Sequence, residues 1–141
     1  RMRGCGHFRT IFHREASLRV MGMIQAIERE GLKPGLAINP ETAVAQIETL
    51  LPYLDNVCVM GIAPGFAGQK MLDYTFTKIA DLKSAMARTG SHATITVDGG
   101  VKADNAARLA KAGADILVVS SGIYAHSRPT ESLKEIRALL G

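Results

Sequence analysis

The sequence contains no tryptophan, and aromatic residues make up only 5% of its 141 residues. Proteins that bind single-stranded nucleic acid usually combine clustered cations with aromatic side chains on which bases stack. Here lysine and arginine are scattered and the net charge is only +4. The chain also lacks any apolar run near the roughly 20 residues needed to span a bilayer. We therefore expect a globular protein with no nucleic-acid or membrane partner, whose mild positive charge suits a small anionic ligand.

Cysteine is also scarce. Cys5 and Cys58 lie far apart in the sequence and show no metal-ligand spacing. Cys58 falls within an apolar run, where cysteine usually behaves as a small buried hydrophobe. No apolar segment typical of a signal peptide follows Arg1. We expect a cytoplasmic protein without a disulfide.

Short apolar runs alternate with longer amphipathic ones along the chain. We predict strands over 8–12, 33–38, 56–62, 93–97 and 116–119, and helices over 18–30, 43–51, 72–88, 103–112 and 130–140. This alternation predicts an α/β fold with a parallel sheet and right-handed crossovers.

The positions of the glycines favour a barrel over an open sheet. Open sheets usually carry their glycine-rich loop after the first strand. Here the glycines follow the last three strands, where (β/α)₈ barrels often bind phosphate. Five strands cannot close an eight-stranded barrel. Either further units lie outside this sequence, or a second chain completes the sheet.

Three consecutive loops carry small residues whose backbone amides can face an anion. Gly65 and Gly68 lie in the first loop, Gly99 and Gly100 in the second, and Ser120-Ser121-Gly122 forms the third. Each loop alone also reads as an ordinary turn. Asp98 ends a strand, where barrels place catalytic groups, although an aspartate there also suits a turn or a helix N-cap.

Other candidates are weaker. His13 ends the first strand and either contacts a ligand or is a structural histidine. Met60 ends a strand and either lines a pocket or packs in the core. Asn39 begins the segment 39–42, which ends one strand and starts the next helix. Its side chain either serves only this turn or faces the site. No two histidines have metal-ligand spacing.

Together these motifs resemble the ribulose-phosphate 3-epimerase family over nearly the whole chain. The similar segments are His13-Arg14-Glu15-Ala16, Gly35-Leu36-Ala37-Ile38-Asn39-Pro40-Glu41-Thr42, Pro64-Gly65-Phe66-Ala67-Gly68-Gln69, Val97-Asp98-Gly99-Gly100-Val101 and Ala112-Gly113-Ala114-Asp115. The resemblance implies a TIM (β/α)₈ barrel of which this chain holds the C-terminal five βα units, strands four to eight. Residues 1–141 would form one partial barrel domain without the first three units.

The resemblance also implies an isomerase of carbohydrate metabolism, in the pentose phosphate pathway. Such an enzyme inverts C3 of a ketose phosphate (ribulose 5-phosphate, xylulose 5-phosphate or a related hexulose 6-phosphate) through an enediolate. A divalent metal (zinc, iron, manganese or cobalt) assists the proton transfer. Asp98 matches a residue that is both a metal ligand and an acid/base group. The substrate-binding residues implied are Met60, Gly65, Phe66, Ala67, Gly68, Gly99, Gly100, Ser120 and Ser121.

The sequence departs from the family pattern at Ala67, Met71 and Ser120, which replace glycine, phenylalanine and glycine. Ala67 and the Asn39-Pro40-Glu41-Thr42 segment resemble the allulose-6-phosphate 3-epimerase branch. The family's other metal ligands lie on strands that this sequence does not contain, so we expect the chain alone to be inactive.

Two alternatives to the epimerase remain open. One is a non-catalytic or vestigial half-barrel that binds a sugar phosphate. The other is a phosphate-binding lyase or isomerase, which would need a catalytic lysine at the C-terminal end of a strand. Lys33 lies at the start of its strand instead. Exposed sheet edges lead us to expect a homo-oligomer.

Overall fold

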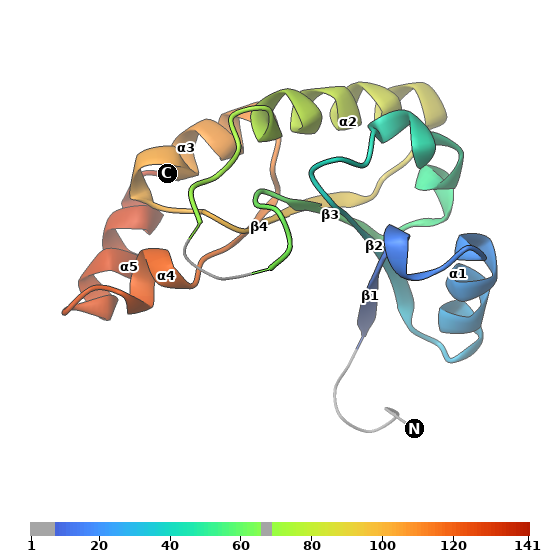
Figure 1. Ribbon diagram of the computed structural model, residues 1–141, viewed down its shortest axis with the longest axis horizontal. Coiled ribbons are helices and arrows are strands. Elements are labelled where there is room, and N and C mark those ends of the chain that lie inside the picture. The colour runs from blue at the N-terminus through green and yellow to red at the C-terminus, as the bar shows by residue number, and fades with distance from the viewer. Residues whose placement is uncertain (1–7, 66–68) are drawn as a thin grey trace.

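The computed structural model describes residues 8–65 and 69–141. Its centre is one sheet of parallel strands in the order β1-β2-β3-β4-β5 (Figure 1). The strands are β1 (Arg9–His13), β2 (Lys33–Ile38), β3 (Asn56–Met60), β4 (Thr94–Asp98) and β5 (Ile116–Val118). The predicted α/β fold with five parallel strands is confirmed.

Helices connect the strands and lie along one side of the curved sheet (Figure 1). They are α1 (Val20–Arg29), α2 (Thr75–Thr89), α3 (Ala103–Ala112), α4 (Ser121–Tyr124) and α5 (Pro129–Ala138). A single 3₁₀ turn, η1 (Arg14–Ala16), follows β1. Among the described residues, no helix has the length and apolar character required to cross a bilayer.

The helix expected over 43–51 is wrong. The structure has two 3₁₀ helices there, η2 (Val44–Gln46) and η3 (Glu48–Tyr53). The hydrogen bonds are i→i−3, as from the N–H of Ile47 to the carbonyl of Val44 at 3.0 Å. Pro52 lies inside η3 and has no N–H, and its ring would clash with the carbonyl four residues earlier in an α-helix. The proline therefore favours the tighter turns.

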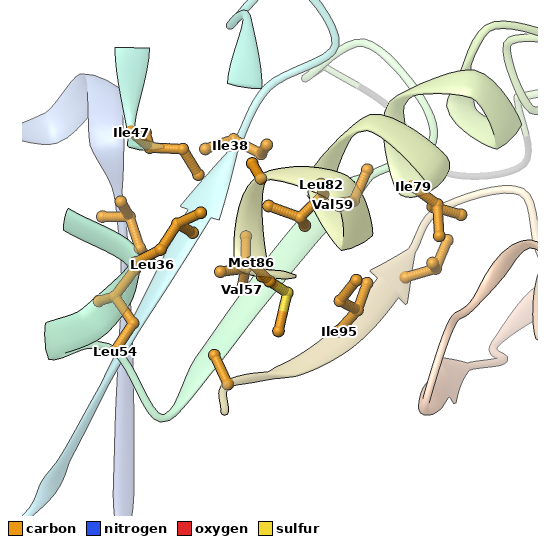
Figure 2. Packing of buried hydrophobic residues seen from close by; sticks show 14 of the residues in the cluster. Leu36, Ile38, Ile47, Leu54, Val57, Val59, Ile79, Leu82, Met86 and Ile95 are labelled. Atoms are coloured by element: carbon orange, nitrogen blue, oxygen red, sulfur yellow. The ribbon is translucent and has the colours of Figure 1, made fainter. Parts of the chain in front are cut away.

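The core lies between the sheet and its helices. Alternate strand residues point toward α2, whose buried Ile79, Leu82 and Met86 pack onto them (Figure 2). The strand residues on this face are fully buried: Leu36, Ile38, Val57, Val59, Ile95 and Val97. Burying apolar side chains of this size contributes about 1.5–3 kcal/mol each, so this layer holds the strands in place.

Among residues 8–65 and 69–141 no helix covers the other face of the sheet, which we call the open face (Figure 1). The register places His13 beside Ala37, Ala37 beside Cys58, and Met60 beside Asp98 on this face. Several apolar side chains here are exposed, including Ile11 at 43%, Ile116 at 39% and Val118 at 41%. Strands β1 and β5 form the two edges of the sheet. Ligand-binding groups at the strand ends of this face are therefore accessible.

A small ion-pair cluster lies at the opposite end of the sheet from the glycine loops. The Asp55 carboxylate contacts Arg9 Nε at 2.5 Å and Lys33 Nζ at 3.1 Å. Partial burial alone would raise the pKa of Asp55, but the hydrogen bonds and charges of Lys33 and Arg9 outweigh it and lower the pKa. The cluster joins the start of β1 and β2 to the start of β3.

The lowered pKa of Asp55 predicts a pH-dependent contribution to stability. A carboxyl group with a lowered folded-state pKa stabilises the fold above its ordinary value of 3.8, and this contribution disappears as the pH falls through the folded-state pKa. We expect Asp55→Asn to lower the melting temperature at pH 7, and the difference from wild type to shrink at about pH 3 and below. Thermal unfolding followed by circular dichroism measures both.

Asp81→Asn is the matched control, since Asp81 in α2 is exposed and makes no ion pair with the described residues. This variant should melt with the wild type at both pH values. A gap for Asp55→Asn that is as large in acid as at neutral pH would contradict the role of its charge.

Candidate functional site

The C-terminal ends of β4 and β5 enclose a cavity of about 110 Å³. It brings together many of the site residues proposed from the sequence, together with three apolar ones. The lining residues are Ile62, Asp98, Gly99, Gly100, Val101, Val118, Ser120 and Ser121. One carboxylate, glycine backbone and two serine side chains therefore share one small space at the predicted edge of the sheet.

Gly61 fixes the position of this cavity at the end of β3. Its N–H donates to the carbonyl of Asp98 at 2.7 Å, and its own carbonyl accepts from the N–H of Leu72 at 2.9 Å. A side chain at residue 61 would collide with the carbonyl oxygen of Gly99. Only glycine allows the two loops to approach this closely.

The turn after Asp98 also requires glycine. Gly99 and Gly100 have φ values of 104° and 71°, and a Cβ on Gly100 would lie 2.7 Å from the nitrogen of Met71. Asn105 holds the turn, because its Nδ2 donates to the Gly100 carbonyl at 2.9 Å while its Oδ1 accepts from the Lys102 N–H at 2.9 Å. Within the described part of the chain the N–H groups of Gly99 and Gly100 make no backbone hydrogen bond. They are free to bind an anion.

Asp98 lies on the open face of the sheet, next to its register partner Met60. Helix α3 begins at Ala103 with Lys102 as its N-cap, so the N-cap alternative for Asp98 is wrong. Its carboxylate makes no hydrogen bond or ion pair with any described residue. The carboxylate is therefore available to a ligand.

Cys58 lies on the same face as Asp98 and stays protonated. Burial first, and then the negative charge of Asp98, raise the pKa of the Cys58 thiol to about 11. A thiol with this pKa is not a nucleophile at neutral pH. Cys58 therefore acts as a packing residue, as the sequence indicated.

The remaining candidates lie outside this cavity. Gly65 is exposed and does not line it. Phe66, Ala67 and Gly68 fall outside the described residues. Gln69, which follows them, donates from Nε2 to the Ala63 carbonyl at 2.9 Å and so ties the two sides of the loop together.

His13 and Asn39 lie at the ends of β1 and β2. The His13 ring is half exposed, with Nδ1 3.6 Å from Glu15 Oε2. The side-chain oxygen of Asn39 is buried and does not open onto the cavity. The backbone N–H of Asn39 donates to Glu15 Oε1 at 3.1 Å. These residues form a second polar group, separate from the cavity at Asp98.

Sequence reasoning missed the apolar lining of the cavity. Ile62 lies within the glycine-rich segment, and its side chain is the one that a Cβ on Gly99 would strike. Val118 is the strand residue paired with Asp98. The alternation of residues along β5 carried that signal, because every second residue faces the open side.

The described residues do not themselves form a metal site. Within residues 8–65 and 69–141 no three histidine, cysteine, aspartate or glutamate side chains lie close enough together to hold an ion. Asp98 therefore belongs to no group of three such side chains within these residues. A divalent cation bound at Asp98 would need ligands from beyond these residues.

The strand order and the cavity at the strand ends define a TIM-barrel class of α/β protein, and comparison with solved structures agrees. A 3-hexulose-6-phosphate synthase superposes with a TM-score of 0.70 at 18% identity, covering 96% of this chain and 63% of that one. A tryptophan synthase α-subunit from Pyrococcus furiosus gives 0.71 at 17% identity, covering 99% and 57%. The chain is thus a part of a barrel in extent, confirming the predicted fold class.

The sequence itself matches the model of the ribulose-phosphate 3 epimerase family over residues 5–124. Ribulose-phosphate 3-epimerase of Buchnera aphidicola subsp. Acyrthosiphon pisum is 36% identical over 129 residues, which are 92% of this chain and 57% of that protein. The enzyme of Escherichia coli K12 is 34% identical over 129 residues with the same coverage. The chain belongs to the ribulose-phosphate 3-epimerase family and spans 57% of the length of these relatives.

Because the backbone of Met71 lies so close to Gly100, we expect a side chain at position 100 to destabilise the fold. Comparing this substitution with one at Gly31 separates the cost of the steric overlap from the cost of the backbone conformation. Gly31 and Gly100 have nearly equal φ values, 74° and 71°, but a Cβ on Gly31 would meet nothing within 4 Å. Gly31→Ala should cost only the left-handed backbone, about 1–2 kcal/mol. Gly100→Ala should cost about 1–3 kcal/mol more, because the methyl group also overlaps Met71. Urea unfolding measures both, and equal costs would show that the loop yields freely.

Proposed function

We propose that this chain supplies the phosphate cradle and one acid/base group of an epimerase that inverts C3 of a ketose phosphate. A ribulose phosphate fits the names of the relatives, and the family resemblance suggests ribulose 5-phosphate or xylulose 5-phosphate. A hexulose 6-phosphate fits the resemblance of Ala67 and residues 39–42 to the allulose-6-phosphate branch. The observation that carries the proposal is the single cavity shared by Asp98, the Gly99–Gly100 turn and Ser120–Ser121.

The cavity suits the phosphate group of such a substrate. The free N–H groups of Gly99 and Gly100 and the hydroxyls of Ser120 and Ser121 are hydrogen-bond donors without a lysine or arginine among the lining residues. Backbone amides bind phosphate well, and glycine lets the anion approach closely. Ile62, Val101 and Val118 add an apolar part to the lining.

In this proposal Asp98 exchanges the C3 proton. Its carboxylate has no partner among the described residues and lies beside the cradle. Acting as a base, it would take the proton from one face of C3, leaving the electron pair in an enediolate. Inversion requires a different group to return a proton to the opposite face. Among the described residues that line the cavity Asp98 is the one carboxylate, so this second group would lie outside that lining.

The family resemblance implies a divalent metal ion, namely zinc, iron, manganese or cobalt. The described lining of the cavity offers one carboxylate, which alone does not form a metal site. Asp98 would be this chain's contribution to such a site.

A second candidate function is a non-catalytic sugar-phosphate-binding half-barrel that oligomerises in the cytoplasm. The exposed apolar residues Ile11, Ile116 and Val118 on the open face, and the unpaired edges of β1 and β5, favour it. Exposed parallel edges invite pairing with another chain. This alternative keeps the cradle and gives Asp98 no role in proton transfer.

Replacing the proposed base separates the two functions. We expect Asp98→Asn in the intact protein to abolish C3 epimerisation, because an amide cannot accept the proton. The fold should persist, since the Asp98 side chain makes no hydrogen bond within the described chain. Exchange of the C3 hydrogen with D₂O, followed by NMR, measures the chemistry, and thermal melting measures the fold.

Asp81→Asn, on the exposed surface of α2, is the control and should epimerise at the wild-type rate. If Asp98→Asn keeps near wild-type activity, the proposed role of Asp98 is wrong. If the intact wild-type protein binds phosphate but never exchanges the C3 hydrogen, the non-catalytic function replaces the epimerase.

Phosphate binding at the cradle can be tested without turnover. In a titration of the ¹⁵N-labelled protein with inorganic phosphate, we expect the amide resonances of Gly99, Gly100 and Ser121 to shift and saturate together. Gly31 and Gly90, at distant helix ends, should not move. Shifts confined to other residues would place the anion elsewhere and remove the basis of the proposed function.

A further inference from the structure

Lys78 is a lysine buried in the core-facing side of α2. Its exposed fraction is 9%, and it lies one residue before the fully buried Ile79. Its Nζ donates to three backbone carbonyls, those of Asn39 at 3.0 Å, Pro40 at 2.5 Å and Thr42 at 2.8 Å. All three N–H groups of the ammonium are therefore used on one turn, residues 39–42.

This arrangement is costly to build, which points to a specific use. Burial lowers the pKa of Lys78, although the negative charges of Glu41 and Glu15 oppose the shift. Buried lysines are uncommon because the ammonium gives up its hydration. A methionine would fill the same space on α2 without that cost. What the ammonium adds is a three-point hold on backbone that has no other regular structure.

The 39–42 turn, anchored by Lys78, also binds the carboxylate of Glu15. The N–H of Asn39 donates to Glu15 Oε1 at 3.1 Å, and the hydroxyl of Thr42 donates to the same oxygen. Burial alone would raise the pKa of Glu15, but these two hydrogen bonds and the nearby His13 lower it. The other carboxylate oxygen, Oε2, lies 3.6 Å from His13 Nδ1. A chain of contacts therefore runs from Lys78 to His13.

This chain of contacts ends on the same edge of the sheet as the cradle. His13 is the last residue of β1, and its register partner Ala37 lies on the open face. The 39–42 turn follows the last residue of β2. Because the strands are parallel, these ends and the end of β4 at Asp98 lie on one rim. The Glu15 and His13 side chains are accessible there, at 34% and 47% exposure.

We propose that Lys78 is a positioning residue, which anchors the 39–42 turn and thereby sets the places of Glu15 and His13 on the rim that also carries the phosphate cradle. The expected effect of Lys78 on catalysis rests on the proposed function. Helix α2 also begins three residues after Leu72, whose N–H donates to the carbonyl of Gly61 next to the cradle. Lys78 thus ties the two sides of the rim to one helix.

The test compares Lys78→Met with Lys83→Met in the intact protein. Lys83 lies in the same helix, with its side chain 42% exposed and in contact with Asp115. In the absence of substrate, Lys78→Met should raise the pKa of the Glu15 carboxyl, followed by ¹³C NMR, and speed hydrogen exchange at the Asn39 amide. Lys83→Met should change neither. Global destabilisation alone would not move the Glu15 pKa in the folded protein.

With substrate, we expect kcat/KM of Lys78→Met to fall on the order of 10- to 100-fold, as for other misplacements remote from the reacting atoms. The loss should persist at temperatures where the variant is fully folded. Lys78→Gln, which restores two N–H donors, should recover part of it. Should Lys78→Met not fold, Lys78→Gln takes its place, with smaller changes expected in the same directions.

An unchanged Glu15 pKa and unchanged Asn39 exchange in a folded Lys78 variant would overturn the proposal. So would changes in both without loss of kcat/KM in an active enzyme. If the intact wild-type protein shows no C3 epimerisation, the proposed function fails by itself. The two NMR measurements need no substrate, and they still decide whether Lys78 holds the turn.

Discussion

The hydrogen bond from the Gly61 N–H to the Asp98 carbonyl is the interaction on which the site depends. It joins β3 to β4 one residue beyond their regular pairing, at the point where both strands turn away. Because residue 61 has no side chain, the Gly99 carbonyl can lie against it. The Gly99–Gly100 turn then lines the same cavity as Asp98. Any side chain at position 61 would push these two loops apart.

Helix α2 supports both sides of this rim. Its apolar residues Ile79 and Leu82 are fully buried against the sheet, so the helix cannot shift without opening the core. The segment before α2 is bonded to Gly61 through the N–H of Leu72. Lys78 bonds the same helix to the turn after β2. A rigid helix packed across the strands thus turns two separate loops into one edge of defined shape.

The sequence predicted what short-range patterns determine and missed what distant partners determine. The strand at 33–38 and the helix at 103–112 were predicted with the bounds that the structure shows, because apolar spacing and flanking glycines suffice there. The 3₁₀ helices were missed because Pro52 lies beyond the predicted helix and acts on residues before it. Lys78 shares the apolar spacing of Ile79 and Leu82, yet its carbonyl partners come from nearly forty residues earlier in the chain. No local pattern identifies them.

The open face of the sheet limits the chemistry that the proposed function allows this chain alone. A single carboxylate on one side of a carbon can remove a proton and return it to the same side, which exchanges the hydrogen without inverting the centre. Inversion needs a second group on the opposite side, and Asp98 has no such counterpart among the described residues lining its cavity. The exposed Ile116 and Val118 lie on that same face, where barrels bury their interior side chains in layers. Under the proposed function, the second group would therefore lie on the surface that covers these residues.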